Sequence, residues 1–178
     1  MASVAPRKGL SQNFLTDPRT ARRIVDLLEP APGDVVLEIG PGTGALTRHL
    51  VDSSVAHIDA FDIDSRVVSP LQELVDRSQN RLEVHIVNVL SVSLQQHFAK
   101  TAANHRKVVG NIPYSITSEI LFWLFDNANH VDTAVIMMQK EVARRCVGLP
   151  GTKDYGIISV AAWYASEASL KIDRKSVV

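Results

Sequence analysis

The feature that most constrains the fold is an alternation between short apolar runs and segments with helical apolar spacing. Such alternation is typical of proteins in which helices cover both faces of a mostly parallel sheet. We therefore predict an α/β fold of this kind. The expected strands are 35–40, 57–63, 82–87, 107–112 and 133–138, and the expected helices are 43–52, 69–77, 116–127, 139–148 and 155–165.

Two helix beginnings carry local signals. Asp17 precedes Pro18, so a carboxylate can cap the first free N–H groups while proline occupies the first turn. Residues 69–72, Ser-Pro-Leu-Gln, fit a capping box with proline at the first helical position. We expect helices to begin at both places, and residues 30–33 to end the first one.

Size and composition favour one domain of ordinary kind. The 178 residues are 46% hydrophobic, which can supply a buried core, and no apolar run reaches the roughly 18 to 20 residues that span a bilayer. Cys146 is the single cysteine, and the six histidines lack metal-ligand spacing. We expect a cytoplasmic protein that neither spans a membrane nor binds a metal. We expect it to consist of an N-terminal arm (1–16) and a main domain (17–178).

Bulk charge does not indicate nucleic-acid binding, because the formal net charge is +0. Local basic groups are the candidates instead. Arg7 and Lys8 lie in the arm, while Lys140 and Arg144 have the i, i+4 spacing that places them on one helix face. Either they contact phosphates or they form a solvated face, and the pattern alone does not choose.

The sharpest motif is an apolar strand that enters a glycine-rich turn and then a helix. It contains Glu38, Gly40, Gly42 and Gly44. Glycines in such a turn let the backbone approach a ligand closely. A dinucleotide fingerprint would require glycine where Ala45 stands, so an NAD site is disfavoured.

Polar residues end the next two strands. Asp62, followed by Ile63, stands where a carboxylate can accept hydrogens from ribose hydroxyls. Either Asp62 or Asp64 could instead cap the following helix, and Asp64 is the better candidate. Asn88 could face the adenine edge of the same ligand, although an asparagine there is often only a turn residue.

The segment Asn111-Ile112-Pro113-Tyr114 follows the fourth strand. An exocyclic purine amine is a poor nucleophile because its lone pair is delocalised into the ring. The Asn111 side chain and the Ile112 carbonyl could accept its hydrogens, while Pro113 stiffens the turn and Tyr114 stacks on a base lifted from its neighbours. The alternative is an ordinary proline turn beside a core tyrosine.

These motifs, with residues 12–15, 139–145 and 150–156, occur in the order found in the KsgA family of small-subunit ribosomal RNA dimethyltransferases, which the chain resembles over about residues 7–172. The resemblance implies a Rossmann-like class I S-adenosylmethionine-dependent methyltransferase. It implies that the chain acts as a monomer on small-subunit rRNA within a pre-30S-type ribosomal particle. It also implies dimethylation at N6 of two adjacent adenosines near the 3′ end of that RNA.

The resemblance further implies residue roles. Gln12, Asn13 and Leu15 would close over the cofactor, and Gly40 and Gly42 would line its methionine side. Asp62 would hold its ribose, Asn88 would meet its adenine, and the segment 111–114 would hold the target base.

Several departures from the family pattern leave alternatives open. The family usually has glutamate and aspartate where Asp62 and Asn88 stand, which predicts weaker cofactor affinity. Ser11 also occurs in the related Erm enzymes of large-subunit rRNA. The family's C-terminal RNA-binding helical domain is expected to be absent. A DNA or protein-amide methyltransferase and a non-catalytic ribosome-assembly module remain alternatives.

Overall fold

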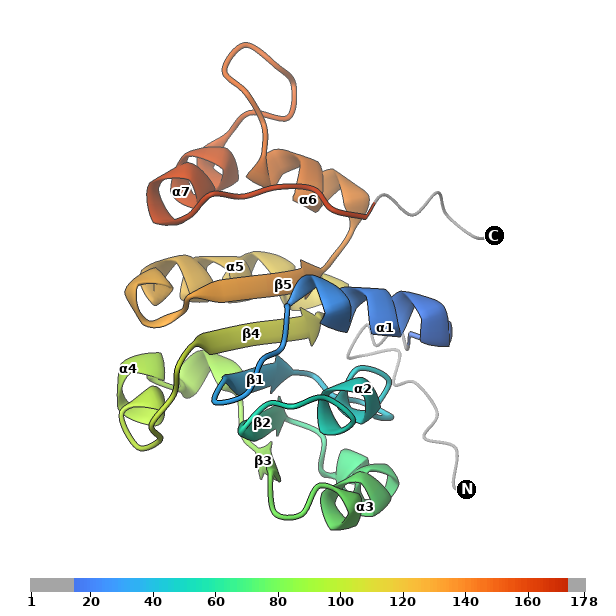
Figure 1. Cartoon of the computed structure of the whole chain (residues 1–178). Helices are drawn as coiled ribbons and strands as arrows, with labels where there is room; N and C mark the ends of the chain where they lie inside the picture. The colour runs from blue at the N-terminus through green and yellow to red at the C-terminus, as the bar shows by residue number, and fades with distance from the viewer. Residues whose placement is uncertain (1–14, 173–178) are drawn as a thin grey trace.

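The computed structural model describes residues 15–172, and five parallel strands form one sheet within that range. The order β3-β2-β1-β4-β5 (Figure 1) confirms the predicted parallel α/β fold. Each strand ends one residue earlier than predicted. The strands are β1 (Val35–Ile39), β2 (His57–Asp62), β3 (Leu82–Ile86), β4 (Arg106–Asn111) and β5 (Thr133–Met137).

Helices cover both faces of the sheet, as Figure 1 shows. On one face α1, α2 and α3 pack against alternate strand residues that include Val36 and Ile58, and on the other α4 and α5 pack against Val35 and Leu37. Strands buried from two sides need apolar residues on both faces, which explains their near-continuous apolar runs. The α-helices are α1 (Pro18–Leu27), α2 (Thr47–Val51), α3 (Val68–Arg77), α4 (Leu94–Phe98), α5 (Thr117–Asp126), α6 (Lys140–Cys146) and α7 (Ile157–Ala165), and the 3₁₀ turns are η2 (Ser65–Val67), η3 (Val89–Ser91), η4 (Tyr114–Ile116) and η5 (Ala128–His130).

The helix beginnings follow the predicted signals in part. The Asp17 carboxylate accepts the Arg19 N–H at 3.1 Å and Pro18 opens α1, as expected. The capping box at Ser69 is wrong: α3 begins at Val68 as a continuation of η2, and Pro70 lies inside its first turn, where no N–H partner is needed.

Two further helices differ from prediction. The helix expected over 43–52 is confined to α2, because residues 42–46 form turns. Helix α4 was not expected: its five residues are too short for a clear apolar period, although Ser93 caps it by accepting the Gln96 N–H at 3.4 Å.

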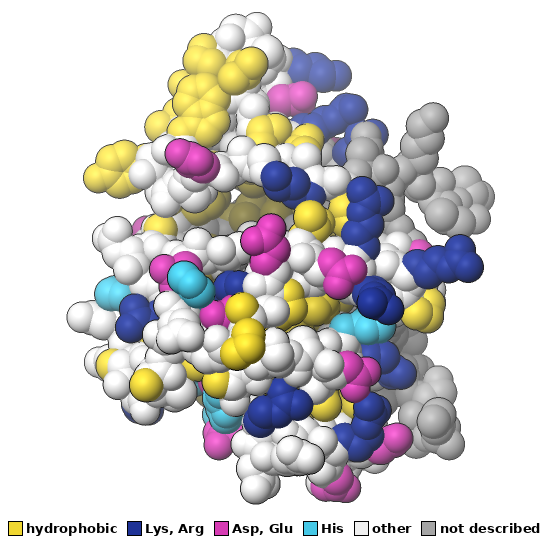
Figure 2. Space-filling view, in the orientation of Figure 1, with side chains coloured by type: hydrophobic (Ala, Val, Ile, Leu, Met, Phe, Trp, Pro, Cys, Tyr) yellow, Lys and Arg dark blue, Asp and Glu magenta, His cyan; other side chains and the backbone are white. Residues whose placement is uncertain are grey.

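Helices α6 and α7 pack on each other and on α5 through Leu121, Cys146 and Ala162, beyond the β5 edge of the sheet (Figure 1). The exposed apolar residues of α7 include Ile157 and Tyr164. Figure 2 shows hydrophobic side chains gathered at the upper left, where Figure 1 places α7 and the loop before it. Across residues 15–172, every helix is too short or too polar to cross a bilayer.

Candidate functional site

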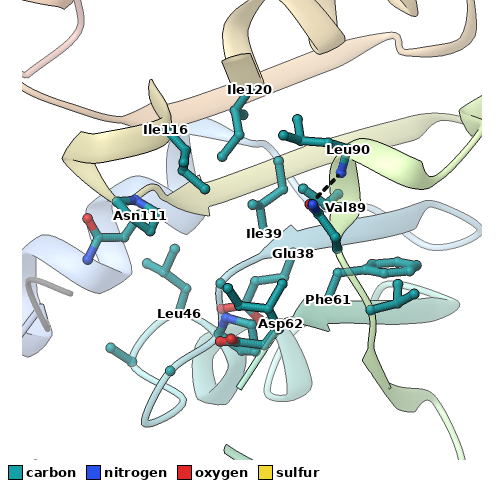
Figure 3. A pocket seen from close by; sticks show the side chains of 18 of the residues that line it. Glu38, Ile39, Leu46, Phe61, Asp62, Val89, Leu90, Asn111, Ile116 and Ile120 are labelled. Carbon is teal, nitrogen blue, oxygen red and sulfur yellow. Dashed lines mark hydrogen bonds between the residues drawn. The ribbon is translucent and has the colours of Figure 1, made fainter. Parts of the chain in front are cut away.

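A cavity of about 260 Å³ opens at the carboxyl ends of β1, β2 and β4. The strand order reverses between β1 and β4, and open parallel sheets bind ligands in the crevice that such a reversal creates. Figure 3 shows Glu38, Asp62 and Asn111 on different strands around this space. Topology therefore brings together side chains that are far apart in sequence.

The sequence predicted most of the polar lining. The predicted residues that line the cavity are Leu15, Glu38, Gly40, Gly42, Asp62, Ile63, Asn88, Asn111 and Pro113. Gly44, Ile112 and Tyr114 do not line it. Gln12, Asn13, Arg7 and Lys8 lie outside the described residues.

Two glycines of the turn serve different purposes, one at the cavity and one in helix packing. Gly40 has φ +67°, and a Cβ atom built there would have only the Asn111 carbonyl oxygen within 4 Å, at 3.9 Å. Gly44 has φ +82°, but its Cβ would lie 2.8 Å from a methyl carbon of Leu74 in α3. Gly40 thus leaves backbone bare beside the cavity, whereas Gly44 lets α3 approach the turn.

Two buried carboxylates face each other across the ends of β1 and β2. Glu38 is 1% exposed, and its Oε2 has no hydrogen-bond partner among the described residues. Burial raises the pKa of Glu38 to about 7; Thr47 opposes the rise and the Asp62 charge adds to it. Burial also raises the pKa of Asp62. A ligand that brings hydrogen-bond donors or positive charge would stabilise the ionised form of these two carboxylates.

Asp64 takes the capping role that the sequence left open between two aspartates. Its carboxylate accepts the Arg66 N–H at 3.1 Å at the start of η2. Asp62 accepts the Asp64 N–H at 2.9 Å and stays in the cavity wall. The prediction that Asp64 is the cap is confirmed.

Asn88 both lines the cavity and caps a turn. Its side-chain oxygen accepts the Leu90 N–H at 3.1 Å, the dashed line in Figure 3, and so begins η3. A carbonyl oxygen has two lone pairs, so one remains for a ligand.

Sequence reasoning missed the apolar wall. It includes Leu46, Phe61, Leu90, Ile116 and Ile120, all labelled in Figure 3. One signal was available: Ile116 and Ile120 are four apart at the start of a helix, and such residues share a face. The other members come from the turn before α2, from β2 and from η3, and their proximity depends on strand order.

The Asn111 to Tyr114 segment is held from several sides. The Ile112 N–H donates to the Met137 carbonyl at 3.2 Å, and the Thr117 hydroxyl donates to the Pro113 carbonyl at 3.0 Å. The Ile112 side chain is 2% exposed in the core, whereas Tyr114 is 45% exposed. The tyrosine is therefore a surface ring beside the cavity rather than a core residue.

A second, charged cleft lies between α6 and the segment that precedes α7. It is lined by Lys140, Arg144, Arg145 and Lys153, with Glu141 and Asp154 among them. Figure 2 shows lysine and arginine side chains along this side of the molecule. The sequence placed Lys140 and Arg144 on one face; the structure adds Lys153, which approaches from the loop.

The fold and the cavity define a Rossmann-like domain of the class I methyltransferase type. The family model described as "Ribosomal RNA adenine dimethylase" matches residues 5–172, and the chain belongs to that family. The resemblance to the KsgA family is thereby confirmed.

Known relatives agree with this assignment. Ribosomal RNA small subunit methyltransferase A of Prosthecochloris aestuarii is 45% identical over 158 residues, 88% of this chain and 57% of the relative. A dimethyladenosine transferase structure from Plasmodium falciparum has a TM-score of 0.70 at 29% identity, covering 84% of this chain and 51% of that one. The 23S rRNA methyltransferase ErmE has a TM-score of 0.64 at 34% identity, covering 76% and 52%. The chain spans 56 to 59% of the length of the first curated relatives.

Proposed function

We propose that this chain transfers methyl groups from S-adenosylmethionine to N6 of two adjacent adenosines near the 3′ end of small-subunit rRNA, two methyls on each. One observation carries the proposal: the glycine turn and the Asn111–Pro113 corner line a single cavity, as direct transfer between a cofactor and a base requires. Family membership and the printed names of the relatives support the choice of substrate. The proposal places the chain in the cytoplasm, where it would act on ribosomal particles as a monomer.

The cavity residues fit S-adenosylmethionine. The unpartnered Glu38 oxygen suits a positively charged ligand, and the bare backbone at Gly40 permits close approach. Asp62 would accept from the ribose hydroxyls, and Asn88 would meet the adenine edge. The bound cofactor would supply an electrophilic methyl group. Gln12 and Asn13 remain predicted contacts from the arm.

The chain's own contribution would be to hold the amine. The Asn111 side-chain oxygen and the Ile112 carbonyl would accept its hydrogens, which favours the geometry from which the nitrogen lone pair attacks. The hydrogen bonds that fix Ile112 and Pro113 would keep these acceptors in place without reorganisation. Tyr114, exposed beside the cavity, would stack on the flipped base.

The central experiment compares Asn111→Ala with the parent chain. Small-subunit particles lacking the modification are incubated with labelled S-adenosylmethionine, and dimethyladenosine is measured by mass spectrometry. We expect at least a 100-fold loss of transfer with cofactor affinity changed less than threefold, since removing one such contact costs about 10²–10³ in rate. Asn129→Ala, an exposed asparagine outside the cavity, is the matched control. Equal activity of both variants would refute the assigned role.

Substrate choice needs a separate comparison, because ErmE is also similar to this chain. We expect transfer to small-subunit particles and not to large-subunit rRNA, DNA or peptide amides. Binding to particles that survives Asn111→Ala, with no transfer by the parent chain, would instead indicate a non-catalytic assembly module.

The basic cleft is the proposed RNA contact. Lys140, Arg144 and Lys153 would meet phosphates, with Arg7 and Lys8 adding charge from the arm. Replacing Arg144 with glutamine should weaken RNA binding and reduce the slope of log affinity against log salt by about 1. An unchanged slope would exclude a phosphate contact at this position.

A further inference from the structure

Away from the cavity, imidazoles and carboxylates gather on the face of β2 and β3 that carries α4. We call this group the histidine cluster: His57 and Asp59 from β2, Glu83 and His85 from β3, and His97 from α4. It contains three of the six histidines in the chain. The sequence showed no metal-ligand spacing because the members come from three elements, and strand register brings Asp59 opposite Glu83.

The ring nitrogens converge on one carboxylate. Asp59 Oδ1 lies 2.7 Å from His85 Nε2 and 3.3 Å from His57 Nε2, and Asp59 Oδ2 lies 3.0 Å from His97 Nε2. Glu83 adds a second carboxylate, with Oε2 3.8 Å from His85 Nε2. The Asp59 side chain is only 5% exposed, whereas the side chains of His85 and Glu83 are 32% and 63% exposed, so the cluster is reached from solvent on the Glu83 side.

We propose that the histidine cluster binds a divalent transition-metal cation of the Zn²⁺ type. Imidazole nitrogens and carboxylate oxygens are its usual ligands, at about 2.0–2.2 Å. Two such ligands on one tetrahedral ion lie about 3.3 Å apart. Donor atoms of His57, Asp59 and Glu83 already lie within 4.8 Å of one another, so small side-chain movements suffice to enclose an ion.

Charge balance favours a cation over hydrogen bonds alone. Across residues 15–172, the ion pairs of Asp59 and Glu83 are all with histidines. A neutral imidazole can donate a hydrogen bond but does not cancel a carboxylate charge. A divalent ion would neutralise the buried Asp59 carboxylate, while the exposed Glu83 carboxylate supplies a second oxygen ligand from the solvent side.

Such an ion would connect the sheet edge to the wall of the cavity. His85 precedes and His97 follows the segment that carries Asn88 and η3. Phe61, a cavity residue, stacks on the His85 ring with centroids 4.6 Å apart. An ion held by Asp59 would therefore act on both ends of this segment through the contacts of His85 and His97 with that carboxylate, whatever ligand the cavity takes.

The test is metal binding by the whole chain after chelator treatment. Zn²⁺ is titrated against a competing chromophoric chelator, and Co²⁺ is used as a spectroscopic probe. We expect about one ion per chain, a higher melting temperature with the ion, and tetrahedral Co²⁺ absorption. Failure to retain Zn²⁺ or Co²⁺ against the chelator would overturn the proposal and leave a hydrogen-bonded network.

Matched variants separate this site from adventitious binding. His57→Gln removes a ligand nitrogen of the group His57, Asp59 and Glu83 but keeps a side-chain N–H donor for Asp59, so the metal-free fold should persist by circular dichroism. We expect at least a tenfold loss of Zn²⁺ affinity, because ligand loss should exceed the effect of an outer contact. His105→Gln, at an exposed histidine outside the cluster, should change affinity less than twofold. Equal losses in the two variants would overturn the site.

Discussion

Glu38→Gln should make the stability of the protein less dependent on pH. Glu38 is fully buried, and burial raises its pKa from 4.5 to about 7. The folded chain therefore keeps this proton between those values while the unfolded chain loses it, so stability falls as pH rises through that window. Each tenfold change in proton affinity is worth about 1.4 kcal/mol, which makes the ionised residue cost about 3 kcal/mol above pH 7.

Urea unfolding at pH 5 and pH 8 measures this effect. Glutamine is neutral at both, so the stability of Glu38→Gln relative to the parent should rise by about 2 to 3 kcal/mol from pH 5 to pH 8. Glu73→Gln, at an exposed position of α3, removes the same formal charge and should give nearly the same difference at both pH values. Parallel pH profiles for the parent and Glu38→Gln would show that the buried carboxyl is ionised throughout, contrary to the reasoning.

Four other substitutions test three separate parts of the structure. Gly44→Ala should destabilise the fold by about 2 to 4 kcal/mol in urea unfolding, because it adds a clash with α3 to backbone strain. Gly40→Ala should cost about 1 to 2 kcal/mol and mainly weaken cofactor binding. Equal losses of stability in the two variants would contradict the assignment of Gly44 to helix packing and Gly40 to the cavity. Lys107→Met should lower the free energy of unfolding by about 3 to 5 kcal/mol, since Asp34 is 0% exposed and Lys107 is its ion-pair partner at 2.8 Å. A loss below about 1 kcal/mol would show that the Asp34 carboxylate is stable without this partner. Asn88→Asp should tighten S-adenosylmethionine binding about three- to tenfold in calorimetry, and an unchanged or weaker affinity would count against the adenine contact.

The sequence predicted the elements that have strong local signals. Val35–Ile39 is apolar except for Glu38 and is followed directly by a glycine, so the position of this strand could be predicted to within one residue. Helix α4 and the start of α3 escaped because each depends on a short turn whose capping residue has several possible partners. Local chemistry thus sufficed for long apolar segments and not for brief ones.

The candidate site shows the same limit at a longer range. Asp62, Asn88 and Asn111 could be predicted because polar residues at the ends of parallel strands share one edge. The assignment of Gly44 to packing needed the position of α3, and the apolar wall at Phe61 needed the strand order. The histidine cluster was beyond local patterns for the same reason, since its members belong to three elements.

Two buried acids on adjacent strands show how partners, and not burial alone, decide the charge of a site. For both Glu38 and Asp59, burial favours the neutral form. Hydrogen bonds from His97 and His85 nevertheless lower the pKa of Asp59 below its ordinary range, while Glu38 lacks donors of that strength and its pKa rises. A cationic ligand in the cavity would stabilise the ionised form of Glu38 and so lower its pKa. Binding of such a ligand near pH 6.5 should therefore release protons. Calorimetry of S-adenosylmethionine binding in buffers of different ionisation enthalpy would detect this release, and its persistence in Glu38→Gln would assign the protons to another group.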